Sequence, residues 1–144
     1  MLRFTSKLKP EYEEKLESLM FFNPGQQTAL ATIMDSVEKF GQPSLYLDQD
    51  RIRVKVEKLY DVQSLFVLDD DTLAAVLVYS RISVESLIVI HIAVEQEYSS
   101  QGNRSDKMLV MRLLNQLRQC ASHIKGIENI RIMNKNSQFI VYPV

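Results

Sequence analysis

Residues 87–94 read LIVIHIAV, and His91 is the only residue in this stretch that is not apolar. A strand that is apolar on both of its faces lies inside a sheet that is covered on both sides. The sequence therefore predicts a central strand over Leu87–Val94, around which the other elements can be placed.

Two further apolar runs precede this strand. Leu65–Leu68 and Leu73–Tyr79 are separated by three consecutive aspartates at 69–71, and a polar break at 81–85 comes before Leu87. Three carboxylates could chelate a hard cation, but between two apolar runs a hairpin turn is the simpler interpretation. The spacing predicts an antiparallel meander of three strands.

An amphipathic helix is predicted after the central strand. From about Asp106, apolar residues recur at helical spacing, and they are Leu109, Val110, Leu113, Leu114, Leu117, Cys120, Ala121 and Ile124. Such a helix packs on the sheet, with Asp106 as its N-cap and Gly126 after its end. Ile127–Met133 and Phe139–Tyr142 are predicted as two more strands.

The first third of the chain predicts a helical hairpin. A short strand over Leu2–Thr5 precedes a helix that opens at Pro10, and a second helix runs from Ala29 to Phe40 before Gly41-Gln42-Pro43. Residues 45–47 and 52–59 then form a strand hairpin around residues 48–50. In its second strand, apolar residues alternate with the basic side chains Arg51, Arg53 and Lys55, which form either a solvated face or a contact surface for an acidic partner.

Length and composition restrict the class of protein. The 144 residues suit one core, so we expect a single α+β domain over 1–144, with a mixed, mostly antiparallel central sheet flanked by helices. A formal net charge of −1 gives no attraction for nucleic acid, and no run approaches the roughly 18 apolar residues of a membrane span. A cytoplasmic protein without membrane or nucleic-acid partners is therefore expected.

Metal and thiol chemistry are not indicated by the sequence. Cys120 is the only cysteine, so an intrachain disulfide or a cysteine-based zinc site is excluded, and its place on the apolar stripe predicts a buried structural thiol. His123 lies near the end of the predicted helix, where a positive charge is favourable. No His and carboxylate pair has metal-ligand spacing, so no metal site is expected.

The order of these elements resembles the GNAT superfamily of acyl-CoA-dependent N-acyltransferases, roughly over residues 64–133. In that family the strand before the cofactor loop ends in a valine and precedes an acidic-aromatic pair, which correspond here to Val94 and to Glu97-Tyr98. The resemblance implies acetyl-CoA or another acyl-CoA as cofactor. It further implies that backbone groups of Ile92 and Val94 pair with the pantetheine arm.

The resemblance also implies a pyrophosphate site in the loop before the helix, formed by backbone amides of Gln101, Gly102, Asn103, Arg104 and Ser105. This loop has one glycine where the family has two. Only eleven residues follow Met133, so relative to the family the C-terminal part is shortened, or a second subunit completes the cleft in a homodimer.

His91 and Glu95 are the candidate catalytic residues, because the strand that carries them lines the acyl-transfer cleft in GNAT folds. We predict that His91 shares a strand face with Leu87, Val89, Ala93 and Glu95. Either side chain could accept the proton of an attacking amine. The alternatives are a hydrogen-bonded core histidine and a solvated carboxylate.

Three functional hypotheses follow. The first is acyl transfer to an amine of a small molecule or a protein. The second is a catalytically inactive GNAT-like module for binding or regulation, and the third is an unrelated small α+β sensor or adaptor. Parallel pairing between the strand that ends at Val94 and the strand from Ile127 separates them, because without it the first two hypotheses fail.

Overall fold

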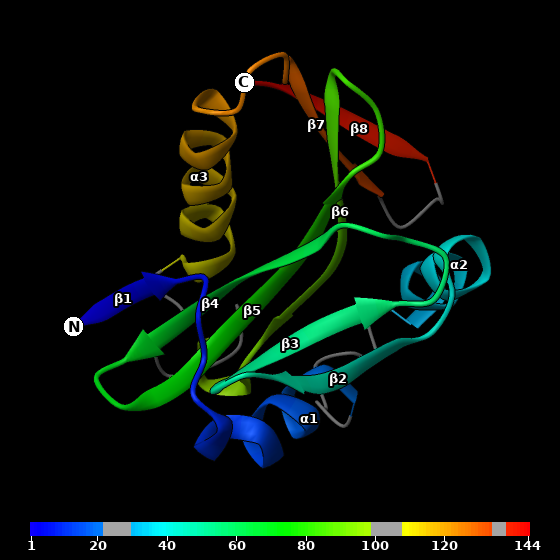
Figure 1. The fold of residues 1–144 in the computed structure, drawn as a ribbon. Helices are drawn as coiled ribbons and strands as arrows, with labels where there is room; N and C mark the ends of the chain where they lie inside the picture. Colours follow the sequence, from blue (N-terminus) through cyan, green and yellow to red (C-terminus); the bar gives the residue numbers. More distant parts are fainter. Residues whose placement is uncertain (22–29, 99–107, 134–137) are drawn as a thin grey trace.

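The structure is a computed structural model that describes residues 1–21, 30–98, 108–133 and 138–144. Its main element is a six-stranded sheet with the strand order β1-β4-β5-β6-β7-β8 (Figure 1). These strands are β1 (Leu2–Thr5), β4 (Val62–Asp69), β5 (Thr72–Arg81), β6 (Ser86–Val94), β7 (Asn129–Met133) and β8 (Phe139–Pro143).

The sheet is mixed, because β6 and β7 pair in parallel and every other neighbouring pair is antiparallel. A parallel pair needs a crossover connection, and here the connection contains helix α3 (Leu109–Ser122). The predicted α+β class is therefore confirmed. The parallel pair on which the first two functional hypotheses depend is present.

Both faces of the sheet are covered, as the apolar sequence of β6 predicts. One face packs against α3 through the fully buried side chains of Leu113 and Leu117. The opposite face packs against α1 (Glu13–Phe21), through Leu16 and Met20, and against the hairpin of β2 (Pro43–Asp48) and β3 (Arg51–Val56). Two separate apolar cores result, with β5 and β6 between them.

The helices of the first third follow the sequence prediction closely. A short 3₁₀ helix, η1 (Pro10–Tyr12), places Pro10 in its first turn, where the missing N–H has no cost, and α1 continues from it. Helix α2 (Leu30–Phe40) ends before Gly41, whose φ of 93° suits glycine and whose N–H is bonded to the carbonyl of Val37. Ala29, the predicted start of α2, lies outside the described residues.

The hairpin of β2 and β3 forms a small sheet of its own. Ile52, Val54 and Val56 point into the core, whereas Arg51, Arg53 and Lys55 lie on the wetter face, so the predicted alternation is confirmed. The backbone N–H of Ile52 also donates to the carbonyl of Leu8 at 2.9 Å, which ties this hairpin to the segment after β1.

Two details of α3 differ from the prediction. Its N-cap position is Met108, with a left-handed φ of 47°, and not Asp106, which lies outside the described residues. Val110, expected in the apolar stripe, is 42% exposed. In the parts of the chain that the structure describes, no helix is long and apolar enough to cross a membrane.

Candidate functional site

The parallel ladder between β6 and β7 ends part of the way along β6, and the point beyond its last pair is termed the strand separation. This ladder runs from Ser86 and Asn129 to Val89 and Ile132, whereas β6 continues to Val94. The N–H of Glu95 donates to the carbonyl of Ala74 on the β5 side. Because backbone direction alternates along a strand, the N–H and C=O of Ile92 point toward the β7 side, beyond the end of that ladder.

A β-bulge lies at the same place. In the register between β5 and β6, Val78 is opposite His91 and Tyr79 is opposite Val89, so Ile90 is an extra residue on β6. A bulge of this kind changes the side on which the following residues lie. His91 therefore faces α1 and α2, while Leu87 and Val89 belong to the core under α3. The prediction that His91 shares a face with Leu87 and Val89 is wrong.

Helix α2 is attached to this bulge by a side chain. The hydroxyl of Ser36 donates a hydrogen bond of 3.2 Å to the carbonyl of Ile90. The bulged residue thus has a partner for its carbonyl, which satisfies a backbone group that an irregular ladder would leave exposed to the apolar interior. This contact positions the face of α2 that carries Ser36 beside His91.

His91 is held neutral by its surroundings. It is 8% exposed, and burial lowers the pKa of its imidazole from 6.5 to about 4, although a hydrogen bond to the backbone of Met20 opposes the shift. Desolvation disfavours the charged imidazolium, so the ring is unprotonated at neutral pH. A neutral imidazole has one nitrogen that donates and one that accepts a hydrogen bond.

Two pockets meet at His91. The smaller pocket, of about 150 Å³, extends to Ile132 and Met133, where β7 and its ladder with β6 end. The larger one, of about 600 Å³, extends between α1 and α2. Four residues are shared by the linings of the two pockets, and they are Ile33, Ser36, Ile90 and His91. One side chain is thus accessible from the strand separation and from the helical side.

The larger pocket is mostly apolar, with two carboxylates. Met20, Phe21 and Ile33 are among its apolar lining residues, and Asp35 and Glu38 are its acidic ones. Lys and Arg are absent from the described residues that line it. The described lining therefore combines an apolar surface with acidic side chains.

Glu95, the second catalytic candidate, follows the end of β6 and is in an ion pair. Its carboxylate lies 2.5 Å from the ammonium group of Lys15 on α1, and its side chain is 23% exposed. The alternative that Glu95 is a solvated carboxylate is therefore only partly correct. The alternation after the bulge places Glu95 and His91 on the same side of β6, as predicted.

The predicted pyrophosphate loop belongs to the part of the chain that the structure does not describe. Gln101, Gly102, Asn103, Arg104 and Ser105 all lie outside the described residues. Val94, whose backbone was expected to contact the pantetheine arm, ends β6, and the 3₁₀ helix η3 (Gln96–Tyr98) begins two residues later. The role of these residues stays a prediction.

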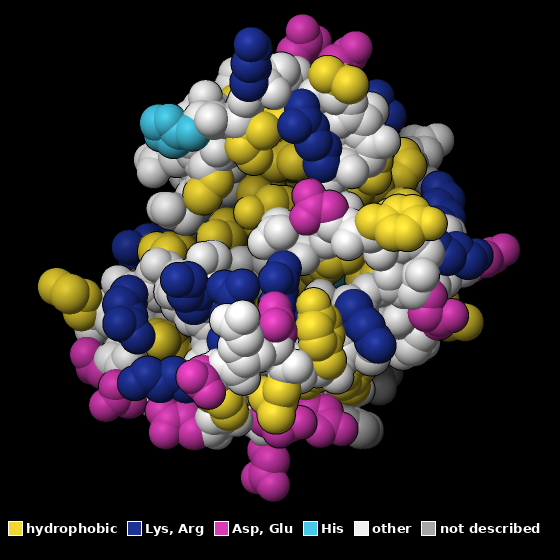
Figure 2. All heavy atoms as spheres, in the orientation of Figure 1, with side chains coloured by type: hydrophobic (Ala, Val, Ile, Leu, Met, Phe, Trp, Pro, Cys, Tyr) yellow, Lys and Arg dark blue, Asp and Glu magenta, His cyan; other side chains and the backbone are white. Residues whose placement is uncertain are grey.

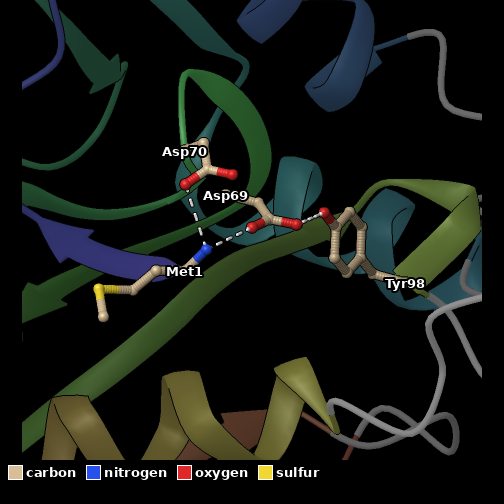
Figure 3. A network of polar contacts seen from close by, with 4 residues as sticks. All are labelled: Met1, Asp69, Asp70 and Tyr98. Carbon is tan, nitrogen blue, oxygen red and sulfur yellow. Dashed lines mark hydrogen bonds and ion pairs between the residues drawn. The ribbon is translucent and has the colours of Figure 1, made fainter.

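A buried polar network near this point was missed in the sequence. The hydroxyl of Tyr98 donates a hydrogen bond to the carboxylate of Asp69, and the amino group of Met1 lies 3.3 Å from the other oxygen of that carboxylate (Figure 3). Asp69 is only 6% exposed, although the sequence assigned all three aspartates to a turn. In β4, Asp69 lies on the same side as Val67, two residues earlier, which is fully buried, and this alternation explains the burial of Asp69.

The remaining candidates have structural positions. Cys120 is partly buried against the α3 core, and His123 is the C-cap of α3, as its sequence position predicts. Within the described ranges, no group of three or more His, Cys, Asp or Glu side chains could hold a metal ion.

The basic strand β3 does not present isolated positive charges. Arg53 lies 3.4 Å and Arg51 3.9 Å from the carboxylate of Asp48. On the face drawn in Figure 2, Lys and Arg side chains are interleaved with Asp and Glu. A separate pocket of about 540 Å³ between β1 and the β2–β3 turn is likewise lined by residues of both charges. Arg51 and Arg53 therefore do not form a separate positive patch on β3.

Comparisons with known proteins identify similar folds only at low identity. No family model matches this chain, and no curated protein matches it. Similar solved structures include a candidate acetyltransferase of the GNAT family from Desulfovibrio desulfuricans, with 15% identity, a TM-score of 0.45, and 92% of this chain and 72% of that chain covered.

An acetyltransferase from Streptococcus agalactiae is also similar, with 10% identity, a TM-score of 0.41, and 91% of this chain and 71% of that chain covered. With scores this low, neither likeness defines what this chain binds or does. The function must be argued from the separation of β6 and β7 and from the pockets beside it.

Proposed function

We propose that this protein is an acyl-CoA-dependent N-acyltransferase that transfers an acyl group, with acetyl as the first candidate, to an amine. The proposal rests on one observation. A pocket lies at the strand separation of β6 and β7, beside the neutral His91. A site for acyl transfer needs an edge that binds an extended donor and an acceptor pocket that meets it. Both features are on the same strand.

The backbone of β6 fits the pantetheine arm of coenzyme A. That arm is an extended chain with two amide groups, and it can pair with a strand as an added strand would. Ile92 offers its N–H and C=O on the side where the β7 ladder has ended, and the smaller pocket begins there. Coenzyme A would supply the acyl group as a thioester. The loop residues Gln101–Ser105 stay the predicted site for its pyrophosphate.

The acceptor amine would bind from the side of α1 and α2. The larger pocket is apolar, and the carboxylates of its lining residues Asp35 and Glu38 can accept hydrogen bonds from an ammonium group. An amine that reaches His91 from this pocket would meet the thioester at the strand separation. The pocket charge therefore supports an amine as the acyl acceptor.

His91 would hold the attacking nitrogen. A pKa of about 4 leaves the imidazole able to accept a hydrogen bond at neutral pH, but it also makes the ring a weak base. We therefore assign to His91 the orientation of the amine, through a hydrogen bond that it accepts. The ammonium group would first lose one proton to water. As the C–N bond forms and the C–S bond of the thioester breaks, a second proton would pass through Glu95 or water to the departing thiolate of coenzyme A.

An inactive GNAT-like module for binding or regulation is the second candidate. Two contacts favour it, because Glu95 is already paired with Lys15 at 2.5 Å, and His91 is buried and hydrogen-bonded to the Met20 backbone. Side chains held in this way can serve the structure alone. Binding of the acyl donor separates the two candidates.

Isothermal titration calorimetry with acetyl-CoA and with free coenzyme A tests the proposal. Micromolar binding, which corresponds to about −8 kcal/mol, is expected for both ligands. The Ile92→Pro variant, which lacks the N–H on the β7 side, should bind at least tenfold more weakly while its circular dichroism spectrum is unchanged. ADP, which has no pantetheine arm, should bind both proteins equally.

Absence of heat with acetyl-CoA at millimolar concentration would refute the acyltransferase and leave the binding module. If the donor binds, amine acceptors with an apolar body are the first to screen for release of free thiol. His91→Gln should then lower the rate of transfer, with an unchanged Kd for acetyl-CoA. A transfer rate equal to that of the unmodified protein would exclude the role assigned to His91.

A further inference from the structure

The pocket of about 540 Å³ between β1 and the β2–β3 turn is separate from the site at His91. Helix η1 and the turn between β4 and β5 also contribute to its lining, through Tyr12 and Asp71. None of the described residues lines both this pocket and a pocket at His91. Its volume is typical of small-molecule sites. An inference about its ligand therefore does not depend on the proposed function.

Hydrogen bonds between elements hold the walls of this pocket in place. The hydroxyl of Tyr12, on η1, donates to the backbone carbonyl of Asp71 at 2.9 Å. The N–H of Ile52, on β3, donates to the carbonyl of Leu8, also at 2.9 Å. The walls are thus formed before a ligand binds, and a preformed site loses less conformational entropy on binding.

Of the described residues that line the pocket, seven are charged, and both signs are present. Lys and Arg side chains lie beside Asp and Glu around β1 and the β4–β5 turn, as Figure 2 shows. A ligand with one kind of charge would meet like charges on part of this lining. The basic residues are Arg3, Lys7, Lys9 and Arg51, and the acidic ones are Glu11, Asp50 and Asp71.

The opposite charges in this pocket do not pair with one another. In the described parts of the chain, no ion pair joins any two of these seven side chains. Only Arg51 among them is in an ion pair, with Asp48 at 3.9 Å. Elsewhere opposite charges do meet, because Lys15 lies 2.5 Å from Glu95. The fixed walls therefore keep positive and negative groups apart around the pocket.

The same two hydrogen bonds divide the lining into an acidic wall and a basic wall. Glu11 lies on η1 and Asp71 in the β4–β5 turn, which are the elements that the first bond joins, and they form the acidic wall. Lys7 and Arg51 each precede a residue that the second bond joins, and they form the basic wall. The turn residue Asp50, which precedes Arg51, is outnumbered there.

We propose that this pocket binds a zwitterion, namely a short peptide with a free amino end and a free carboxyl end. The ammonium end would contact the acidic wall, and the carboxylate end would contact the basic wall. Arg51 suits a carboxylate, because its guanidinium offers two parallel donors. A peptide of two residues spans about 7 Å, so its two charges can reach both walls at once.

Isothermal titration calorimetry of the full chain with the dipeptide alanylalanine tests the proposal. A dissociation constant of about 1 mM or below is expected, because the ligand has few atoms. Alanylalanine amide lacks the carboxylate, and N-acetyl-alanylalanine lacks the ammonium group. Each blocked peptide should bind about tenfold more weakly, since each loses one charge-assisted contact.

Variants of the two walls identify which end binds where. Asp71→Asn retains the backbone carbonyl of the turn and should reduce the preference for a free ammonium end. Lys7→Gln should reduce the preference for a free carboxylate end. Lys125→Gln and Glu128→Gln, at exposed positions outside the pocket, are the matched controls and should retain both preferences. Circular dichroism checks that each variant is folded, and Glu11→Gln takes the place of Asp71→Asn if the latter is not.

Absence of heat with alanylalanine at tens of millimolar would overturn the proposal. So would equal binding of the three peptides, or preferences that neither wall variant reduces. Binding of one blocked peptide as tightly as of alanylalanine would show a site for a single charge, and would equally exclude a zwitterion as the ligand.

Discussion

The hydroxyl of Tyr98 donates a hydrogen bond to the carboxylate of Asp69, and both side chains are buried, with exposed fractions of 3% and 6%. Asp69 ends β4, and Tyr98 ends η3, just before the predicted cofactor loop. A buried carboxylate is costly unless donors satisfy it. The pair therefore attaches the start of that loop to the hairpin of β4 and β5.

Removal of this hydroxyl should destabilise the protein. Tyr98→Phe retains the aromatic ring in the core but removes a donor from a buried carboxylate, so the free energy of unfolding should fall by about 1–3 kcal/mol. Equilibrium unfolding in urea measures the change. Tyr60→Phe is the matched control, because Tyr60 is fully exposed, and its effect should be negligible. Equal losses in the two variants would contradict a specific role for the Asp69 contact.

The two sides of α3 should differ sharply in their tolerance of truncation. Leu113 is fully buried, whereas Val110 is 42% exposed. Leu113→Ala should lower the free energy of unfolding by about 2–5 kcal/mol, because the lost methyl groups leave a cavity. Val110→Ala should change it by less than about 0.5 kcal/mol. Comparable losses at both positions in urea unfolding would mean that the apolar stripe is as wide as the sequence predicts.

The elements of the fold could be predicted because their apolar periods are clear. The continuous apolar run of β6 and the alternation of Ile52, Val54 and Val56 in β3 each specify one type of strand. The helical period of the apolar residues in α3 did not determine the width of its apolar stripe. Val110 has the right residue type for the core, and only the docking of the helix on the sheet decides that it stays exposed.

The candidate site was harder to predict, because its geometry depends on one extra residue. Ile90 is one of several apolar residues in a continuous run, and its residue type does not predict a bulge. Its insertion still decides that His91 faces α1 and α2. The contact from Ser36 to Ile90 joins residues 54 positions apart, so no local pattern could reveal it.

The Ser36 contact should contribute measurably to stability. Ser36→Ala removes the donor to the Ile90 carbonyl, and the free energy of unfolding should fall by about 1 kcal/mol, as for a typical partly buried hydrogen bond. Ser122→Ala removes a similar bond, to the carbonyl of Gln119, at an exposed position, and should have a smaller effect. The proposed function adds that Ser36→Ala weakens acetyl-CoA binding, whereas Ser122→Ala does not. If the two variants had equal free energies of unfolding and equal affinities for acetyl-CoA, the strand neighbours alone would hold the bulge.

Stability should depend on pH through His91. Burial lowers the pKa of this imidazole from 6.5 to about 4, so between these values the unfolded chain binds a proton that the folded protein excludes. The free energy of unfolding therefore rises with pH across this window. The stability that the buried neutral imidazole of His91 contributes is fully present above pH 6.5 and is lost as the pH falls toward 4. The full loss is roughly 3 kcal/mol, since one pKa unit corresponds to about 1.4 kcal/mol.

Carboxylates also titrate as the pH falls, so the effect of His91 must be obtained as a difference between proteins. His91→Gln has no titrating group at this position, and between pH 7 and pH 4 it should lose less stability than the unmodified protein. Ser122→Ala, at an exposed position beside the C-cap of α3, changes no titrating group and should retain the full pH dependence. Urea unfolding at a series of pH values measures all three slopes. If His91→Gln and the unmodified protein lost stability in parallel, the imidazole would be accessible to protons in the folded state, and the pocket would be open to water.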